Sequence, residues 1–96
     1  MKSETAIQLS ALFQKMKTLK ANDNGFYDLR SLINEMINCI EKDPNPSEIL
    51  LKWLKHDKSE LERYKFGNNR SYNEEIISEF KRHLQSDLER AGVLIV

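Results

Sequence analysis

The sequence of 96 residues is poor in the residues that interrupt helices or build special sites, with three glycines, two prolines and one cysteine. A single cysteine cannot form an internal disulfide, and no Cys/His cluster has the spacing of a zinc site. The glycines are isolated, so no phosphate-cradling GxGxxG or GxxxxGKS/T loop exists. These absences exclude a disulfide scaffold, a zinc finger and the common nucleotide-binding motifs.

The sequence also lacks an excess of charge and a long apolar run. Fifteen basic residues balance fifteen acidic ones. This argues against a general nucleic-acid binder, which usually shows a basic excess, and against a polyacidic mimic. The longest apolar run, Val93–Val96, is too short to span a bilayer, and the first ten residues contain no stretch of signal-peptide type. We therefore expect a cytoplasmic protein.

What the sequence does contain is enough apolar side chain for one core. Hydrophobic residues make up 40% and charged residues 31%, which is typical of a folded chain. A chain this short cannot divide into two independent cores. We expect a single helical domain over residues 1–96.

Apolar residues recur at spacings of three and four in four segments, about 3–20, 27–41, 46–66 and 71–91. This period predicts amphipathic helices, and the short connections predict an all-α fold, a small antiparallel bundle of four to five helices. The apolar stripes comprise Leu9, Leu12, Phe13, Met16 and Leu19; Phe26, Leu29, Leu32, Ile33, Met36, Ile37, Cys39 and Ile40; Ile49, Leu50, Trp53, Leu54, Leu61 and Tyr64; and Ile76, Ile77, Phe80, Leu84, Leu88 and Ala91.

Capping residues and turn signals predict where these helices begin and end. Gly92 and Val93 predict a Schellman ending in which Val93 packs back toward Leu88. Asp43 precedes Pro44 and therefore ends the second helix. The other predicted boundaries are N-caps at Ser3, Asn45 and Ser71, a turn over 22–25 and a C-terminal cap at Gly67.

The third segment allows two interpretations, because Asp57 and Glu60 have the spacing of a capping box in its middle. If the helix is continuous, Asp57 lies in the apolar stripe beside Leu54 and Leu61. If the helix breaks, Asp57 caps its second half. We prefer the break, since a cap satisfies backbone donors without burying an ion.

Two histidines each have a carboxylate four residues further on, His56 with Glu60 and His83 with Asp87. This spacing would suit a metal site or an oriented acid–base histidine. For His83 and Asp87 we favour a buried polar pair, in which each side chain is the hydrogen-bond partner of the other. An enzyme based on His56 and His83 would need both side chains in one pocket. Cys39 has no histidine or cationic cluster near it in sequence, which favours a structural thiol. We expect no catalysis, no metal and no cofactor.

The balanced charge hides a basic first segment and an acidic second one. Residues 1–25 hold four lysines against Glu4 and Asp23, whereas residues 26–46 hold two basic groups against four acidic ones. The outer face of the second helix has no lysine and carries Tyr27, Ser31, Asn34, Glu35, Asn38 and Glu41. Amides and carboxylates accept hydrogen bonds from Arg and Lys, so we predict that this face binds a basic protein. The alternative is an ordinary solvated face that pairs with neighbouring helices.

The stretch GFYDLRSLINEMINCIEKDPNP, the proline-capped helix after it and the SYNEEIISEFKRHLQ helix resemble the small helical immunity proteins with which bacteria neutralise toxins, including those of contact-dependent inhibition systems. The resemblance lies in the order of elements and the style of surface. It implies a non-catalytic inhibitor that binds a toxin domain, often a nuclease.

Three other functions stay open at this point. A helical adaptor or homo-oligomer would bury Ile7 and the Val93–Val96 tail between chains. A nucleic-acid binder would use the basic residues of the third helix, although acidic residues interrupt them. A histidine-based enzyme and the nucleic-acid binder are both less favoured than the immunity protein and the adaptor or homo-oligomer.

Overall fold

The computed structural model describes residues 1–19, 23–64 and 70–93, which form four α-helices. These are α1 (Ser3–Lys17), α2 (Asp23–Glu41), α3 (Glu48–Arg63) and α4 (Arg70–Arg90). The described ranges contain no strand. The all-α class is therefore confirmed. The described residues form four helices, the lower number of the four to five that the sequence predicts.

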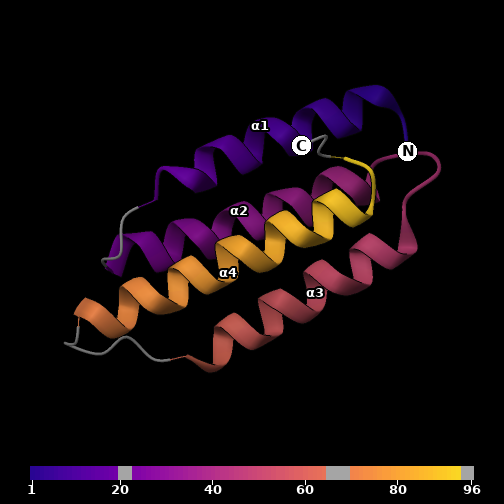
Figure 1. The fold of residues 1–96 in the computed structure, drawn as a ribbon. Coiled ribbons are helices and arrows are strands. Elements are labelled where there is room, and N and C mark those ends of the chain that lie inside the picture. The colour runs from indigo at the N-terminus through magenta and orange to yellow at the C-terminus, as the bar shows by residue number, and fades with distance from the viewer. Residues whose placement is uncertain (20–22, 65–69, 94–96) are drawn as a thin grey trace.

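Successive helices run in alternating directions, so that each packs antiparallel to the next (Figure 1). α1 contacts α2 and α4, and α3 contacts the same two helices from the other side. No Cα atom of α1 lies within 8 Å of one of α3 among the described residues. The bundle thus has α2 and α4 at its centre and α1 and α3 on its flanks.

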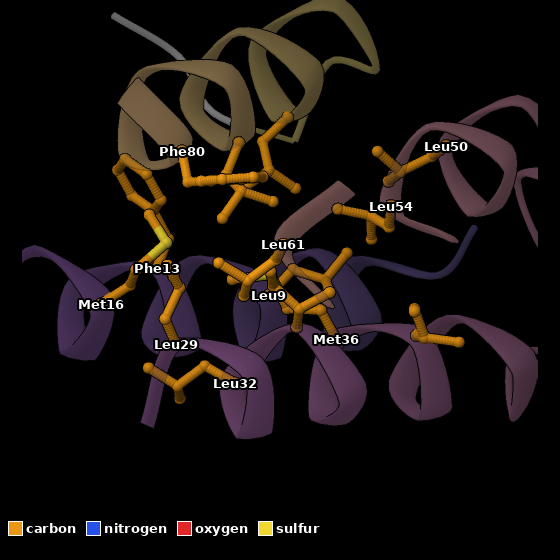
Figure 2. Close-up of a cluster of buried hydrophobic side chains, with 14 of the residues drawn as sticks. Leu9, Phe13, Met16, Leu29, Leu32, Met36, Leu50, Leu54, Leu61 and Phe80 are labelled. Carbon is orange, nitrogen blue, oxygen red and sulfur yellow. The ribbon is translucent and has the colours of Figure 1, made fainter. Parts of the chain in front are cut away.

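The core is built from the apolar stripes of all four helices, whose side chains meet along the bundle axis (Figure 2). Its buried members are Leu9, Phe13, Met16, Leu29, Leu32, Ile33, Met36, Ile37, Ile40, Leu50, Leu54, Leu61, Ile76, Ile77, Phe80, Leu84 and Leu88. Leu12, Leu19, Cys39, Trp53 and Ala91 are partly buried against them.

The stripe of α3 is narrower than the sequence predicts. Ile49 is 51% exposed and Tyr64 is 37% exposed, so neither is a core residue. Ile49 follows directly after the first residue of the helix and lies beside Leu50, which takes the inward position. The predicted position of Phe26 falls outside the described side chains.

The helix ends agree with the sequence only in part. The Schellman ending of α4 is confirmed: Val93 N–H donates to the Leu88 carbonyl at 2.9 Å, Gly92 N–H donates to the Glu89 carbonyl at 3.0 Å, and Gly92 has φ +75°. Val93 also packs against the core. α2 ends at Glu41, before Asp43 and Pro44, as predicted.

Other boundary predictions are wrong by one or a few residues. α2 begins at Asp23, within the expected turn over 22–25. α3 begins at Glu48, and its N-cap is Ser47 rather than Asn45: the Ser47 hydroxyl accepts from the Leu50 N–H at 3.4 Å. α4 begins at Arg70, before the predicted cap Ser71. Gly67 lies outside the described residues.

The α2–α3 connection caps the N-terminus of α1, so Ser3 is not the cap. Asp43 Oδ2 accepts from the Lys2 N–H at 2.8 Å and from the Thr5 hydroxyl at 2.6 Å. Asp43 Oδ1 accepts from the Asn45 N–H at 2.8 Å. Ser3 lies inside the helix, whose N-cap residue is Lys2. One carboxylate therefore orders its own loop and closes the start of α1.

α3 is continuous through Asp57, and the predicted break near this residue is wrong. Leu50, Leu54, Asp57 and Leu61 follow one another at spacings of four, three and four, which keeps all of them on the inner side of one helix. A break would turn Leu61 away from the core, so burial of the leucines outweighs the local capping signal. Asp57 is consequently only 6% exposed.

Candidate functional site

The face of α2 predicted to bind a partner is open to solvent. Tyr27 is 62% exposed, and Ser31, Glu35, Asn38 and Glu41 are also exposed, whereas Asn34 is half-buried. Within the described part of the chain, neither Glu35 nor Glu41 forms an ion pair. The carboxylates are therefore accessible to another molecule.

Two shallow hollows flank this face. The hollow between α1 and α2, of about 520 Å³, is lined by Glu35 and Asn38 together with Lys15 and Lys42. The hollow between α2 and α3, of about 410 Å³, is lined by Asn34, Asn38 and Glu41 together with Lys55 and Lys58. Asn38 borders both hollows. The predicted residues thus form a ridge with one carboxylate on each side rather than one flat patch.

The wall of the second hollow holds an ion pair that links α2 to α3. Arg30 Nε lies 3.9 Å from Glu62 Oε1, and both side chains are about half exposed. An exposed pair of this kind contributes little to stability. Glu41 is the α2 carboxylate that lines this hollow, and among the described residues it forms no ion pair.

A third hollow lies between α3 and α4 and was not predicted as a site. Its volume is about 260 Å³, and its lining residues are His56, Asp57, Glu60, Tyr64, Glu79, Phe80 and His83. The two histidines, which are distant in sequence, therefore converge on one cavity. This is the arrangement that a histidine-based enzyme would require.

The predicted buried pair of His83 and Asp87 does not form. The His83 side chain is 59% exposed, and its Nε2 lies 3.9 Å from Glu79 Oε1. The Phe80 ring lies beside it, with 6.4 Å between ring centroids. Asp87 instead pairs with Asp57 of α3, because it lies one helical turn further along α4, where the two helices are in contact.

Asp57 and Asp87 form a buried acid pair between α3 and α4. Desolvation by burial, then the hydrogen bond to Asp87 and the charge of Asp87, raise the pKa of Asp57 to about 8. Oδ2 of each residue is buried and has no hydrogen-bond donor among the described residues. A proton held by Asp57 at neutral pH supplies one donor to the pair. The proton on Asp57 therefore removes one of the two negative charges that the pair would otherwise hold.

The other groups that could carry chemistry are less distinctive. No three His, Cys, Asp or Glu side chains in the described ranges are placed to hold a metal ion. Cys39 is half-buried, and its thiol donates to Gln8 Oε1 at 3.0 Å. Burial first, and then the charge of Asp43, raise the pKa of the thiol, which keeps it protonated and weakly nucleophilic.

The remaining findings concern the rest of the surface and the comparisons with known proteins. Ile7 is 68% exposed, and of the Val93–Val96 tail only Val93 is described. None of the helices in the described ranges has the length and apolar character needed to span a membrane. The chain matches no protein-family model, no curated protein and no solved structure.

Proposed function

We propose that this protein is a non-catalytic inhibitor that binds a basic toxin domain of the nuclease class, in the manner of bacterial immunity proteins. The observation that carries the proposal is the open face of α2. Glu35 and Glu41 lie on either side of an amide ridge, are exposed, and form no ion pair with any other described residue. A cationic surface that binds nucleic acid in a toxin would be complementary to this ridge.

The face combines three contributions that protein interfaces use. Carboxylates speed association with a basic partner and discriminate against acidic ones. Amides such as Asn38 and Asn34 supply hydrogen bonds at the interface. Tyr27, 62% exposed at the start of the same face, offers the large amphipathic ring that interface hot spots favour.

Charge reversal of the two glutamates tests this proposal. The variant E35K/E41K should bind the cognate toxin domain about 100-fold more weakly, since each reversal replaces an attractive contact with a repulsive one. Its melting temperature should stay close to that of the parent chain, because both side chains are exposed. Titration calorimetry against the purified toxin domain measures the affinity.

The matched control is E4K/E75K, which makes the same change in net charge on exposed positions of α1 and α4. This control should keep most of its affinity. Equal weakening of both variants would show only a long-range charge effect, and full affinity of E35K/E41K would remove the α2 face as the binding surface.

A further inference from the structure

A straight stripe of exposed polar side chains runs along α2 on the side nearer to α1. Ser31, Glu35, Asn38 and Lys42 follow one another at spacings of four, three and four, which is the spacing of a coiled-coil seam. Lys42 comes directly after the last residue of α2, and its N–H donates to the Asn38 carbonyl at 3.1 Å, so the helical turn extends to it. These four residues, the polar stripe of α2, therefore face one direction.

The two charges of the polar stripe are not used inside the molecule. Neither Glu35 nor Lys42 forms an ion pair with another residue that the structure describes. They also cannot pair with each other, because two helical turns, or about 10 Å of rise, separate them. Each charge is therefore available to a group from another molecule.

The order of groups along the polar stripe is complementary to itself. If a second α2 lies antiparallel beside the first, with a two-fold axis next to Asn38, then Glu35 of each copy lies opposite Lys42 of the other. Asn38 lies close to its own symmetry mate, and an amide carries both donors and an acceptor, so two such groups can pair. A parallel arrangement would instead place like charges opposite each other.

The surface beside the polar stripe favours close approach of a second helix. Ser31 and Asn38 have short side chains, and Ala11, Leu12 and Cys39 form the apolar part of the adjoining hollow between α1 and α2. Leu12 and Cys39 are only partly buried against the core. A second copy would remove the rest of this apolar surface from water, which favours association in addition to the ion pairs.

We propose that two copies of this chain associate through the polar stripe of α2, antiparallel, as a symmetric dimer. Two Glu35–Lys42 ion pairs and a contact between the two Asn38 amides hold it. A second copy is the occupant that the stripe selects, because it supplies the opposite charges and the matching amide at the required spacing. The interface is small and its ion pairs border solvent, so the dissociation constant should be on the order of 10–100 µM.

The dimer covers part of the face proposed to bind a toxin domain. Glu35 and Asn38 belong to both surfaces, whereas Glu41 lies on the other side of the ridge. One consequence, which rests on the proposed function, is that a toxin domain has to displace the second copy. The dimer itself does not depend on that function.

Sedimentation velocity of the full chain between about 5 µM and about 1 mM tests the proposal. The parent chain should change from monomer to dimer over this range, and added salt should weaken the dimer. E35K and K42E each replace both ion pairs by like charges and should raise the dissociation constant at least about tenfold. E41K makes the same change as E35K on the other side of the ridge and should dimerise like the parent. All three positions are exposed, so melting temperatures should stay close to that of the parent.

Combining the two charge reversals gives a result that only antiparallel pairing predicts. In a dimer of one E35K copy with one K42E copy, both ion pairs again join opposite charges. An equimolar mixture should therefore dimerise although neither variant does so alone. The double variant E35K/K42E has the net charge of the parent and should also dimerise like the parent, which excludes a general charge effect.

A disulfide between copies tests the arrangement without changing any charge of the stripe. N38C in a C39S background places one thiol of each copy beside the axis, so diamide should oxidise the two thiols to a covalent dimer as it is itself reduced. E41C in the same background carries an exposed thiol on the other side of the ridge and should cross-link much more slowly.

Three results would overturn the proposal. These are a parent chain that stays monomeric at about 1 mM, no loss of dimer in E35K and K42E, or equal cross-linking of the two cysteine variants. The toxin-binding role of the α2 face is measured separately, by titration of the toxin domain with E35K/E41K, and none of these three results decides it.

Discussion

At the scale of single residues, Asp43 shows how one carboxylate can hold together two distant parts of the chain. It accepts hydrogen bonds from Lys2 and Thr5 at the start of α1 and from Asn45 in its own loop. The Thr5 hydroxyl first, and then the two backbone N–H groups, lower the pKa of Asp43 to about 2. All three bonds favour the ionised form.

The lowered pKa predicts a loss of stability in acid. In the unfolded chain Asp43 titrates near its ordinary value, so its contribution is complete above about pH 4. The contribution is lost as the pH falls through that value toward about 2. The variant D43N should melt at a lower temperature than the parent at neutral pH and lose less stability between about pH 4 and about pH 2. Thermal melts followed by circular dichroism over this range measure both effects.

A suitable comparison is D28N, which removes an exposed carboxylate from α2. This variant should follow the pH curve of the parent. Identical acid curves for D43N and the parent would show that the capping bonds do not contribute.

Part of this residue-scale picture could be predicted from the sequence. Asp43 before Pro44 correctly predicted where α2 ends, because that effect is local. The capping of α1 by Asp43 could not be predicted, since Thr5 is 38 residues away and only the packing of α1 against α2 brings the two together. Ser3 was predicted as the cap because a sequence shows only which residues are near one another along the chain.

At the scale of elements, the burial of the apolar stripe of α3 outweighs a local capping pattern in its sequence. The capping-box pattern at Asp57 predicted a break, whereas the leucine stripe required a continuous helix. The spacing of Leu50, Leu54 and Leu61 contained the decisive information, because only an unbroken helix keeps all three on one side. What the sequence did not contain was the partner of Asp57, a second carboxyl on another helix.

The buried acid pair predicts a decline of stability in alkali. The pKa of Asp57 is raised, so its favourable contribution is complete below the ordinary value of about 4 and is lost as the pH rises through about 8. The variant D57N keeps a donor toward Asp87 and cannot ionise. It should be more stable than the parent above about pH 8, by about 1–3 kcal/mol. Urea unfolding at several pH values measures the difference.

The comparison for this variant is E60Q, which removes a carboxylate one turn further along α3 that is more exposed. E60Q should keep the alkaline decline of the parent. A D57N variant that is less stable than the parent at every pH would show that the acid pair is favourable even when ionised.

At the scale of the whole molecule, the fold depends on how the flanking helices are held to the central pair. The 3.6-residue period was sufficient to predict an all-helical bundle, since each stripe has to be buried. It was not sufficient to predict the α3–α4 cavity, which depends on the rotation of two helices about their axes. For the same reason the sequence could not predict whether His56 and His83 converge, which a histidine-based enzyme would require. The ridge on α2 could be predicted because all of its residues belong to one helix.

Lys81 of α4 is the contact that ties the end of α1 to the bundle. Its ammonium group donates to the carbonyls of Lys17 at 3.2 Å and Leu19 at 3.0 Å, at the C-terminal end of α1. A cation there also complements the helix dipole. Burial lowers the pKa of Lys81, so the hydrogen bonds compensate for partial loss of solvent.

Replacing this lysine should loosen the bundle as a whole. K81M keeps the aliphatic stem and loses both hydrogen bonds, and it should lower the free energy of unfolding by about 1–2 kcal/mol. For a domain of this size the melting temperature should fall by roughly 4–8 °C per kcal/mol. K52M, at an exposed position of α3, should melt like the parent. Equal melting of K81M and the parent would assign the α1–α4 association to apolar packing alone.

The acid pair between α3 and α4 also makes folding consume hydrogen ions. Among the described side chains, Asp43 and Cys39 have the same charge at pH 7 in the unfolded and the native chain. Asp57 does not, because it is ionised in the loose chain and protonated in the native one. Refolding in weakly buffered neutral water should therefore turn the solution slightly alkaline.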